Sequence, residues 1–551
     1  MTLANSGSGN SGGGNSGDRS STARILIRNI LSNWMGFAVH ALVAFFLTPF
    51  VLHALGEGRY GIWALVTGLT GYYGLLDMGL RSGLTRSYTR CLGVGDYERL
   101  NRVASSGFVA LGACSLLLLI ASCVLAAVAP TIFRLQAHLH EELRWAILII
   151  GGSTALHFLL FPYAAVFSAT QRYDVANAIG ITFRLLSAGG VCWALSRDYG
   201  LVGLSGVTAV CNLIEYGVRW RVACRLLPQL RITPGLASWE TCWDFSQFGL
   251  WSVAINGSQR LIAYSDAVLI AFFYPPAAVG LFNLGASVAG QFQQLFNPIA
   301  TVFYPTLAQM DARGEQESIR RVYLAGSRLL VLLAVTLGLI AAFWTNDFFG
   351  LWLGRKYAVA AGWESPPQIF RILLLATFLS ISQRIGVQVL FATEHLRTLS
   401  ILLLSEAGLN LILSLALLPT MGIAGAAVGT LVPALIFEGF VKPWIVGQVL
   451  AISFGRYLHE VWLRPIAVGL ILCPAFSALH FVCPGRNWGE ILLAGAAGVI
   501  IALPVLVALG LTANDRLRLL SQLASAGRFR HLTDWVLVVV EKKTAAGHRA
   551  E

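Results

Sequence analysis

Long apolar stretches separated by short polar segments run through this chain from about residue 30 to residue 511. Most stretches hold about 20 residues, the length that an α-helix needs to cross the hydrocarbon core of a bilayer. The pattern predicts an all-α polytopic membrane protein. We expect about fourteen transmembrane helices, at 30–53, 60–80, 106–130, 145–168, 175–196, 201–220, 247–273, 278–304, 326–345, 367–391, 399–418, 421–442, 464–482 and 490–511.

The composition excludes an ordinary soluble protein. Charged residues make up 12% of the 551 residues and hydrophobic residues 56%, with a mean hydropathy of +0.69. A soluble domain carries about 25% charged residues. The nine cysteines contain no C-x-x-C pair, so we interpret them as small hydrophobic side chains. No basic cluster with interleaved aromatic residues indicates a nucleic-acid partner.

The basic residues predict the orientation of the chain in the membrane. With the N-terminus assigned to the cytoplasm, 28 of the 39 basic residues fall in or beside inward segments, 7 in outward loops and four within spans. Inward segments of membrane proteins are enriched in Lys and Arg. We therefore expect both termini to be cytoplasmic.

Three segments outside the spans have distinct compositions. Residues 1–23 are mainly Gly, Ser and Asn and predict a disordered cytoplasmic tail. Residues 221–246 would be a cytoplasmic linker, and residues 512–551 predict one or two amphipathic helices on the inner membrane face.

Weak internal similarity indicates a duplication. The stretch from Gly200 aligns with the stretch from Gly422 at an offset of 222 residues, and other matches follow at nearly the same offset. Each copy would hold six spans, at 24–220 and 247–442, so both copies insert in the same orientation. We expect two six-helix lobes related by a pseudo-twofold axis along the membrane normal, plus two extra helices within 464–511.

Several short motifs resemble those of a known family. They are Tyr60-Gly61-Ile62-Trp63, Leu75-Leu76-Asp77-Met78-Gly79-Leu80, Gly95-Asp96-Tyr97-Glu98 and Leu351-Trp352-Leu353-Gly354. Over about residues 24–450 the chain resembles the polysaccharide-transport branch of the multidrug/oligosaccharidyl-lipid/polysaccharide exporter superfamily, which includes the O-antigen flippases. The resemblance implies two lobes around a central cavity. It also implies that the protein moves a lipid-linked oligosaccharide between leaflets by alternating access of this cavity. The arginine-rich opening of lipid II flippases is not seen.

Polar residues inside the spans are the candidate substrate-binding groups. A charge in the bilayer costs about 2.5–3.5 kcal/mol on insertion scales, so such residues normally face a cavity or one another. Arg260, Arg184 and Arg384 could bind diphosphate or acidic sugars, because guanidinium matches phosphate oxygens. The alternative is that they only neutralise nearby acids. Three amides predicted to share one helix face could bind sugar hydroxyl groups or other helices: Gln291, Gln294 and Asn297.

Two deep carboxylates are candidates for ion coupling. No phosphate-binding loop of the type G-x-x-x-x-G-K-[ST] is present, so the sequence favours an ion gradient as the energy source. Asp266 or Glu406 could exchange a proton as the cavity alternates, or each could belong to a static ion pair. The 222-residue offset makes Glu406 the counterpart of Arg184.

The sequence favours a transporter over an enzyme. The run from His138 to Arg144 does not contain the zinc-binding pattern H-E-x-x-H, because Arg144 stands where its second histidine would be. We expect no metal and no cofactor. The preferred hypothesis is a flippase of the bacterial inner membrane for polyprenyl-diphosphate-linked oligosaccharide, with membrane lipids and a polymerase or glycosyltransferases as further partners. A drug or metabolite antiporter and a membrane scaffold for glycan assembly are the alternatives.

Overall fold

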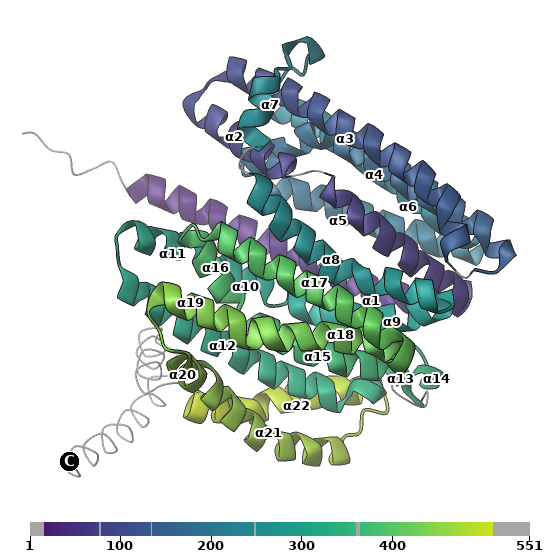
Figure 1. The fold of residues 1–551 in the computed structure, drawn as a ribbon, viewed down its shortest axis with the longest axis vertical. Helices are drawn as coiled ribbons and strands as arrows, with labels where there is room; N and C mark the ends of the chain where they lie inside the picture. Colours follow the sequence, from purple (N-terminus) through teal and green to yellow (C-terminus); the bar gives the residue numbers. More distant parts are fainter. Residues whose placement is uncertain (1–15, 77–78, 134, 247–248, 360–363, 511–551) are drawn as a thin grey trace, which may run out of the picture. The chain divides into compact units, whose positions relative to one another are not determined.

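Helices are the only regular elements in the part of the chain that the structure describes. The structure is a computed structural model that describes residues 16–510 except 77–78, 134, 247–248 and 360–363 (Figure 1). The predicted all-α fold is confirmed. The predicted amphipathic segment 512–551 lies outside the described residues, as do residues 1–15.

The first half of the chain forms eight α-helices, and the 3₁₀ turn η1 (Tyr72–Leu75) follows the first of them. Helix α1 begins within the predicted tail. The α-helices are α1 (Ser16–Gly71), α2 (Leu80–Val94), α3 (Tyr97–Ile132), α4 (His140–Ala169), α5 (Tyr173–Ser196), α6 (Gly200–Leu226), α7 (Trp239–Ser246) and α8 (Gly249–Phe273).

The described part of the second half contains fourteen α-helices, several of them short. They are α9 (Pro276–Gln294), α10 (Asn297–Thr301), α11 (Phe303–Ala312), α12 (Gln316–Phe343), α13 (Thr345–Trp352), α14 (Arg355–Val359), α15 (Pro366–Ser382), α16 (Arg384–Ala392), α17 (Leu396–Met421), α18 (Ile423–Ile436), α19 (Lys442–Leu450), α20 (Phe454–Tyr457), α21 (Leu463–Val482) and α22 (Trp488–Val505).

Eleven helical segments of the described chain are long and apolar enough to cross a membrane. The first of them, 32–75, covers two of the predicted spans. Helices α8 and α9 lie over two more predicted spans but are not among the eleven. The predicted number of fourteen spans therefore stays a prediction.

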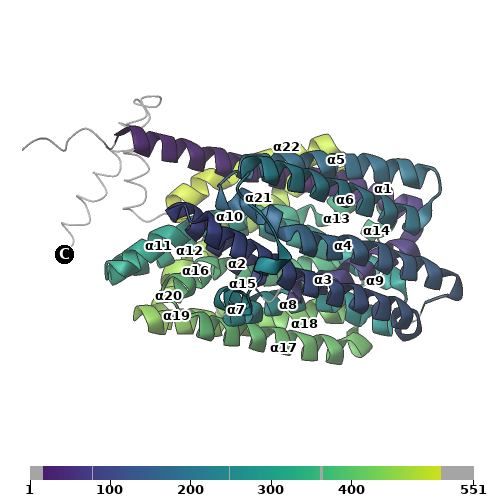
Figure 2. The ribbon, with the colours of Figure 1, turned by 90° about the horizontal axis from the view of Figure 1, so that it is seen from above.

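The chain divides into two compact units. Unit 1 contains residues 1–291, 361–369 and 395–433, and unit 2 contains residues 292–360, 370–394 and 434–551. Unit 1 includes α8 and α17, which the sequence assigns to the second lobe. Within unit 1, helices α1, α5 and α6 lie side by side (Figures 1 and 2).

A glycine within α1 separates the two predicted spans. Gly56 has φ 74° and ψ 167°, which lie outside the helical region. Glycine adopts such positive φ values at no steric cost, because it has no Cβ atom. A second glycine, Gly61, allows close packing, because a Cβ atom there would lie 1.6 Å from the carbonyl oxygen of Pro276. The glycine in the motif Tyr60-Gly61-Ile62-Trp63 thus lets α1 contact the start of α9.

Two predicted spans are interrupted rather than continuous. The span 278–304 is broken at residues 295–296, after which α10 starts with Pro298 in its first turn. Proline favours the start of a helix because it has no N–H to donate within one. The span 367–391 is likewise divided into α15 and α16 at Gln383.

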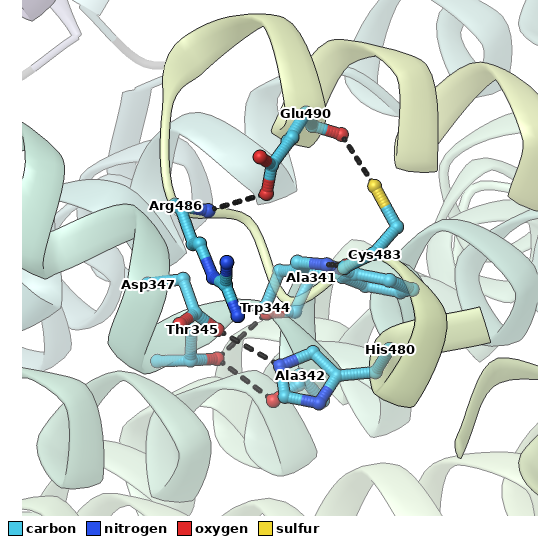
Figure 3. A network of polar contacts seen from close by, with 9 residues as sticks. All are labelled: Ala341, Ala342, Trp344, Thr345, Asp347, His480, Cys483, Arg486 and Glu490. Carbon is cyan, nitrogen blue, oxygen red and sulfur yellow. Dashed lines mark hydrogen bonds and ion pairs between the residues drawn. The ribbon is translucent and has the colours of Figure 1, made fainter. Parts of the chain in front are cut away.

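The two C-terminal helices of unit 2 pack on α12. Phe476 of α21 and Ala494 of α22 share a buried apolar cluster with Leu332 of α12. A polar network reinforces this packing near residue 344 (Figure 3). There the indole N–H of Trp344 donates to the carbonyl oxygen of Cys483 at 2.9 Å.

Candidate functional site

A polar cavity lies among α1, α5 and α6 of unit 1. Its volume is about 480 Å³. Polar groups at membrane depth are costly unless they face water, a ligand or one another, so this cavity is the first candidate site. Its principal polar lining residues are His40, Asn177, Arg184, Ser187, Thr208, Asn212, Glu215 and Arg219.

Helical periodicity brings these side chains together. On α5 the lining residues Asn177, Gly180, Arg184 and Ser187 follow one another at spacings of three, four and three. On α6 the lining residues at 208, 212, 215 and 219 follow at spacings of four, three and four. Residues three and four apart share one face of a helix. Two polar faces therefore converge on the cavity within helices that are otherwise apolar.

The cavity contains one ion pair and one further arginine. The Arg219 guanidinium lies 2.7 Å from the Glu215 carboxylate and also donates to the carbonyl oxygen of Ala176 at 3.1 Å. Gly180 makes room for this pair, because a Cβ there would lie 3.2 Å from Arg219 Nη2. Arg184 makes no hydrogen bond or ion pair with the described residues. Two arginines and one glutamate line the cavity, so these three side chains carry one net positive charge.

The histidines His40 and His157 have different surroundings. His40 lines the cavity together with Arg184. His157 of α4 instead stacks on Tyr216 of α6, with ring centroids 4.7 Å apart. The stacking of His157 on Tyr216 is aromatic packing between helices.

A buried carboxylate forms the second candidate site, between α8, α17 and α18. Asp266 is 6% exposed, and it accepts hydrogen bonds from Ser414 Oγ at 3.1 Å and Thr430 Oγ1 at 2.9 Å. Asn410 donates to the same Thr430 hydroxyl at 2.9 Å and accepts from Ser265 at 3.3 Å. Carboxylate, hydroxyl and amide oxygens are ligands for hard cations, and a carboxylate can also take up a proton.

The other predicted coupling residue lies on the same helix face as this network. Glu406, Asn410 and Ser414 follow one another at four-residue intervals on α17, and Glu406 is also 6% exposed. Residues four apart on a helix are neighbours on its surface. The structure thus places both predicted carboxylates in unit 1, on helices α8 and α17, which pack against each other.

Arg260 is bound to the backbone at the end of α1. Its Nη1 donates to the carbonyl oxygen of Gly71 at 2.7 Å. The guanidinium lies so close to Gly74 that a Cβ there would be 2.2 Å from its carbon. A cation at the C-terminal end of a helix interacts favourably with the helix dipole. The contact is structural, and it leaves the predicted binding role of Arg260 open.

Arg384 lies in unit 2, at the first turn of α16. Its Nε is buried and has no hydrogen-bond partner among the described residues. The neighbouring Gln383 donates to the hydroxyl of Tyr457 and accepts from that of Tyr323 at 3.4 Å. Arg384 is therefore the next residue in the sequence after a member of a buried hydrogen-bond network of unit 2.

The predicted amides occupy the end of α9 and the start of α10. Asn297 Nδ2 donates to Gln294 Oε1 at 2.6 Å, so these two side chains are in contact. Gln294 is exposed, and Gln291 is half-buried one turn earlier on α9. Their role in binding sugar hydroxyl groups stays a prediction.

A second cavity, of about 460 Å³, lies in unit 2. It is lined by Arg371 of α15, by Asp347 of α13 and by His480 of α21. His480 Nε2 lies 2.9 Å from Asp347 Oδ2. The C-terminal helices thus contribute a side chain to this cavity (Figure 3).

Sequence reasoning missed four cavity residues that the structure assigns. Asn177 and Arg219 lie near the ends of predicted spans, and Asn212 and Glu215 lie within one, but the sequence analysis assigns none of them to the site. The signal was available in the spacing of polar residues by three and four along 177–187 and 208–219.

A chain whose described part is helical, with membrane-length helices and polar cavities among them, has the architecture of a multi-pass membrane protein of the transport class. Residues 26–311, more than half of the chain, match the family described as "Polysaccharide biosynthesis protein". The chain belongs to this family. The predicted resemblance to the polysaccharide-transport branch is thereby confirmed.

Two relatives and two solved structures extend the comparison. The chain is 22% identical over 480 residues to the uncharacterized membrane protein EpsK of Bacillus subtilis (strain 168), which covers 85% of this chain and 92% of that protein. It is 19% identical over 439 residues to the putative O-antigen transporter of Shigella flexneri, covering 78% and 99%.

Both solved structures share the two-lobe fold expected from the sequence. The lipid II flippase MurJ, in an inward closed conformation, superposes with a TM-score of 0.60 at 12% identity over 84% of this chain and 97% of MurJ. An inward-facing multidrug resistance MATE transporter gives a TM-score of 0.58 at 11% identity, covering 74% and 95%. At such identities these likenesses show the fold alone.

Proposed function

We propose that this protein is a flippase for polyprenyl-diphosphate-linked oligosaccharide in the bacterial inner membrane. It moves the repeat unit from the inner to the outer leaflet by alternating access and so supplies surface polysaccharide synthesis. It is a transporter rather than an enzyme, with both termini in the cytoplasm.

The observation that carries this proposal is the polar cavity among α1, α5 and α6. It combines the cation of Arg184 with amide and hydroxyl groups of Asn177, Asn212 and Thr208. A phosphate or acidic sugar suits the guanidinium, and sugar hydroxyl groups suit the amides and hydroxyls. Net positive charge favours such anions over the cationic drugs of an antiporter.

The Asp266 site supports ion coupling. A buried carboxylate with two hydroxyl donors can hold a proton or a monovalent cation in one state and release it in another. We propose that Asp266 carries the coupling ion. Glu406, one turn from Asn410 on α17, is the second candidate for this role.

Gene deletion in the host tests the function directly. We expect a diphosphate-linked oligosaccharide to accumulate in the lipid extract, on the inner leaflet, while surface polysaccharide disappears. Complementation with wild type should restore the glycan, whereas Arg184→Gln should not. Arg197→Gln, at the exposed end of the same helix, is the matched control. Intact surface glycan in a strain without a second flippase would favour the antiporter.

A further inference from the structure

The cavity of unit 2 lies where three membrane helices have their ends. It is lined from the end of α12 and the start of α13, from the second turn of α15 and from the end of α21. The charge distribution of the sequence predicts these three ends, near residues 345, 367 and 482, to lie on the outward side. The cavity is therefore expected at the level where the headgroups of the outer leaflet meet the acyl chains.

Arg371 brings a positive charge to this cavity without bonding to an acid. It is partly buried in the second turn of α15, and its guanidinium makes no hydrogen bond or ion pair with the described residues. Asp347 attracts Arg371 through its charge, but the Asp347 carboxylate is bound to His480 Nε2 at 2.9 Å. A charge at this depth is costly unless it faces water, a ligand or a partner.

A second arginine lies beside the cavity, in the connection between α21 and α22. The preceding residue, Gly485, has φ 78° and packs so closely that a Cβ atom there would lie 3.0 Å from Trp344 Cδ1 and 3.1 Å from Asp347 Cβ. The backbone N–H of Arg486 donates to Glu490 Oε2 at 2.8 Å. The connection is thus fixed at both residues, and the Arg486 side chain points toward Asp347 (Figure 3).

The acids near the two arginines bind other groups. Asp347 is bound to His480, and the Glu490 carboxylate accepts from the Arg486 backbone and from Asn487 Nδ2 at 3.1 Å. Within the part of the chain that the structure describes, the Arg486 guanidinium also forms no hydrogen bond or ion pair. Two guanidinium groups therefore keep their donors for a ligand. Their planar geometry and charge match the oxygens of a phosphate.

The remaining surroundings of the cavity are apolar. Ala342 and Phe343 line it from α12. The two residues that follow His480 on α21, Phe481 and Val482, are 89% and 81% exposed. Large exposed apolar side chains at the end of a membrane helix are suited to contact with acyl chains. Phosphate-binding donors beside an apolar surface match a lipid, in which a phosphate is joined to acyl chains.

We propose that this cavity binds the phosphate of an anionic phospholipid of the outer leaflet, with Arg371 and Arg486 on the phosphate oxygens. The acyl chains lie beside Phe343 and Phe481. The site is separate from the cavity among α1, α5 and α6 and does not depend on the proposed transport function. A lipid bound here joins α15 to the connection between α21 and α22, and so stabilises the packing of the C-terminal helices within unit 2.

Native mass spectrometry of the purified full-length protein in detergent tests the proposal. Phosphatidylglycerol is titrated, and the dissociation constant of the first bound lipid is compared among variants. Arg371→Gln and Arg486→Gln should each weaken binding by about tenfold or more, because each removes charged hydrogen-bond donors. Arg355→Gln is the matched control, since Arg355 is exposed on α14 on the same predicted side but does not line the cavity. We expect this control to bind as wild type does.

The melting temperature without lipid shows whether each variant is folded. Both arginine variants should melt as wild type does, because neither guanidinium bonds to the described residues. If Arg371→Gln melts lower, Arg486→Gln decides the test, because Arg486 is exposed. Unchanged phosphatidylglycerol binding by the folded variants would overturn the site.

Two competitors identify the source of the phosphate. We expect neither inorganic phosphate nor a short-chain polyprenyl phosphate to displace phosphatidylglycerol at equal concentration. Displacement by inorganic phosphate would overturn the lipid assignment and indicate a site for small anions. Displacement by the polyprenyl phosphate would overturn the phospholipid assignment and indicate a site for a polyprenyl carrier.

Discussion

Glu215 and Arg219, one turn apart on α6, form an ion pair of 2.7 Å at the wall of the α1–α5–α6 cavity. The pair lies against Gly180 of α5, the residue whose missing side chain leaves space for it. Glu215 forms its ion pair with Arg219 and also attracts Arg184 through its charge, while Arg184 itself forms no ion pair among the described residues. The net charge of the cavity therefore depends on an ion pair within α6 that fits against α5 at Gly180.

A larger residue at position 180 should disturb this arrangement. In Gly180→Val the added methyl groups would reach into the space of the Arg219 guanidinium, so the ion pair must shift toward the cavity. We expect reduced glycan export at a normal protein level. Gly189→Val on the same helix is the control, since a Cβ there meets nothing within 4 Å. Equal export by both variants would show that the pair is not needed.

Substitution of Arg184 should weaken binding of anionic substrate groups. A hydrogen bond to a charged group contributes about 1.5–3 kcal/mol, so Arg184→Gln should lower the affinity for a polyprenyl diphosphate by about tenfold to a hundredfold. Arg184→Lys, which keeps the charge but loses the planar fork, should fall between. Titration of the purified protein with a short-chain polyprenyl diphosphate measures this. An unchanged affinity for the glutamine variant would contradict the assignment.

Glu215→Gln separates the electrostatic role of the pair from its packing. The amide is similar in size but leaves Arg219 without a counter-charge, which raises the net positive charge of the cavity by one. We expect tighter binding of the same polyprenyl diphosphate, together with slower release and therefore reduced export. Weaker binding would show instead that Glu215 contacts the substrate favourably.

The helices could be predicted from the sequence, but the breaks within them could not. A run of about 20 apolar residues has only one way to satisfy its backbone in a membrane, as a helix. The breaks at residues 295–296 and at Gln383 depend on packing and local backbone geometry, and no hydrophobic pattern contains that information.

Only part of the candidate site could be predicted from the sequence. Arg184 and Asp266 are visible as charges within apolar spans. The partners of Asp266 are not, because Ser414 and Thr430 lie 148 and 164 residues further along the chain. Serine and threonine are common in membrane helices, so only the three-dimensional contact assigns these two to the site.

Asp266→Asn should uncouple transport from the ion gradient without unfolding the protein. The amide still accepts hydrogen bonds through its oxygen, but it can neither take up a proton at this site nor balance a cation. Export into vesicles with an imposed proton or sodium gradient measures the coupling. Ser287→Ala removes a hydroxyl that donates only within its own helix, to Leu284 O at 2.9 Å, and serves as control. Gradient-dependent export by the asparagine variant would exclude Asp266, and Glu406→Gln would then be tested in the same way.

The attachment of the C-terminal helices in unit 2 gives a stability prediction. Trp344→Phe keeps the ring on α21 but leaves the carbonyl oxygen of Cys483 without its indole donor. An unmade hydrogen bond at a buried group costs about 1–3 kcal/mol. We expect a lower melting temperature in detergent and faster proteolysis of the connection around Gly485, whose backbone packs on Trp344 and Asp347.

Trp193→Phe changes a ring that is 58% exposed on α5 and should leave both measurements unchanged. If both variants melt alike, apolar packing around Phe476 is sufficient to hold α21 and α22 on α12, and the indole hydrogen bond adds nothing measurable.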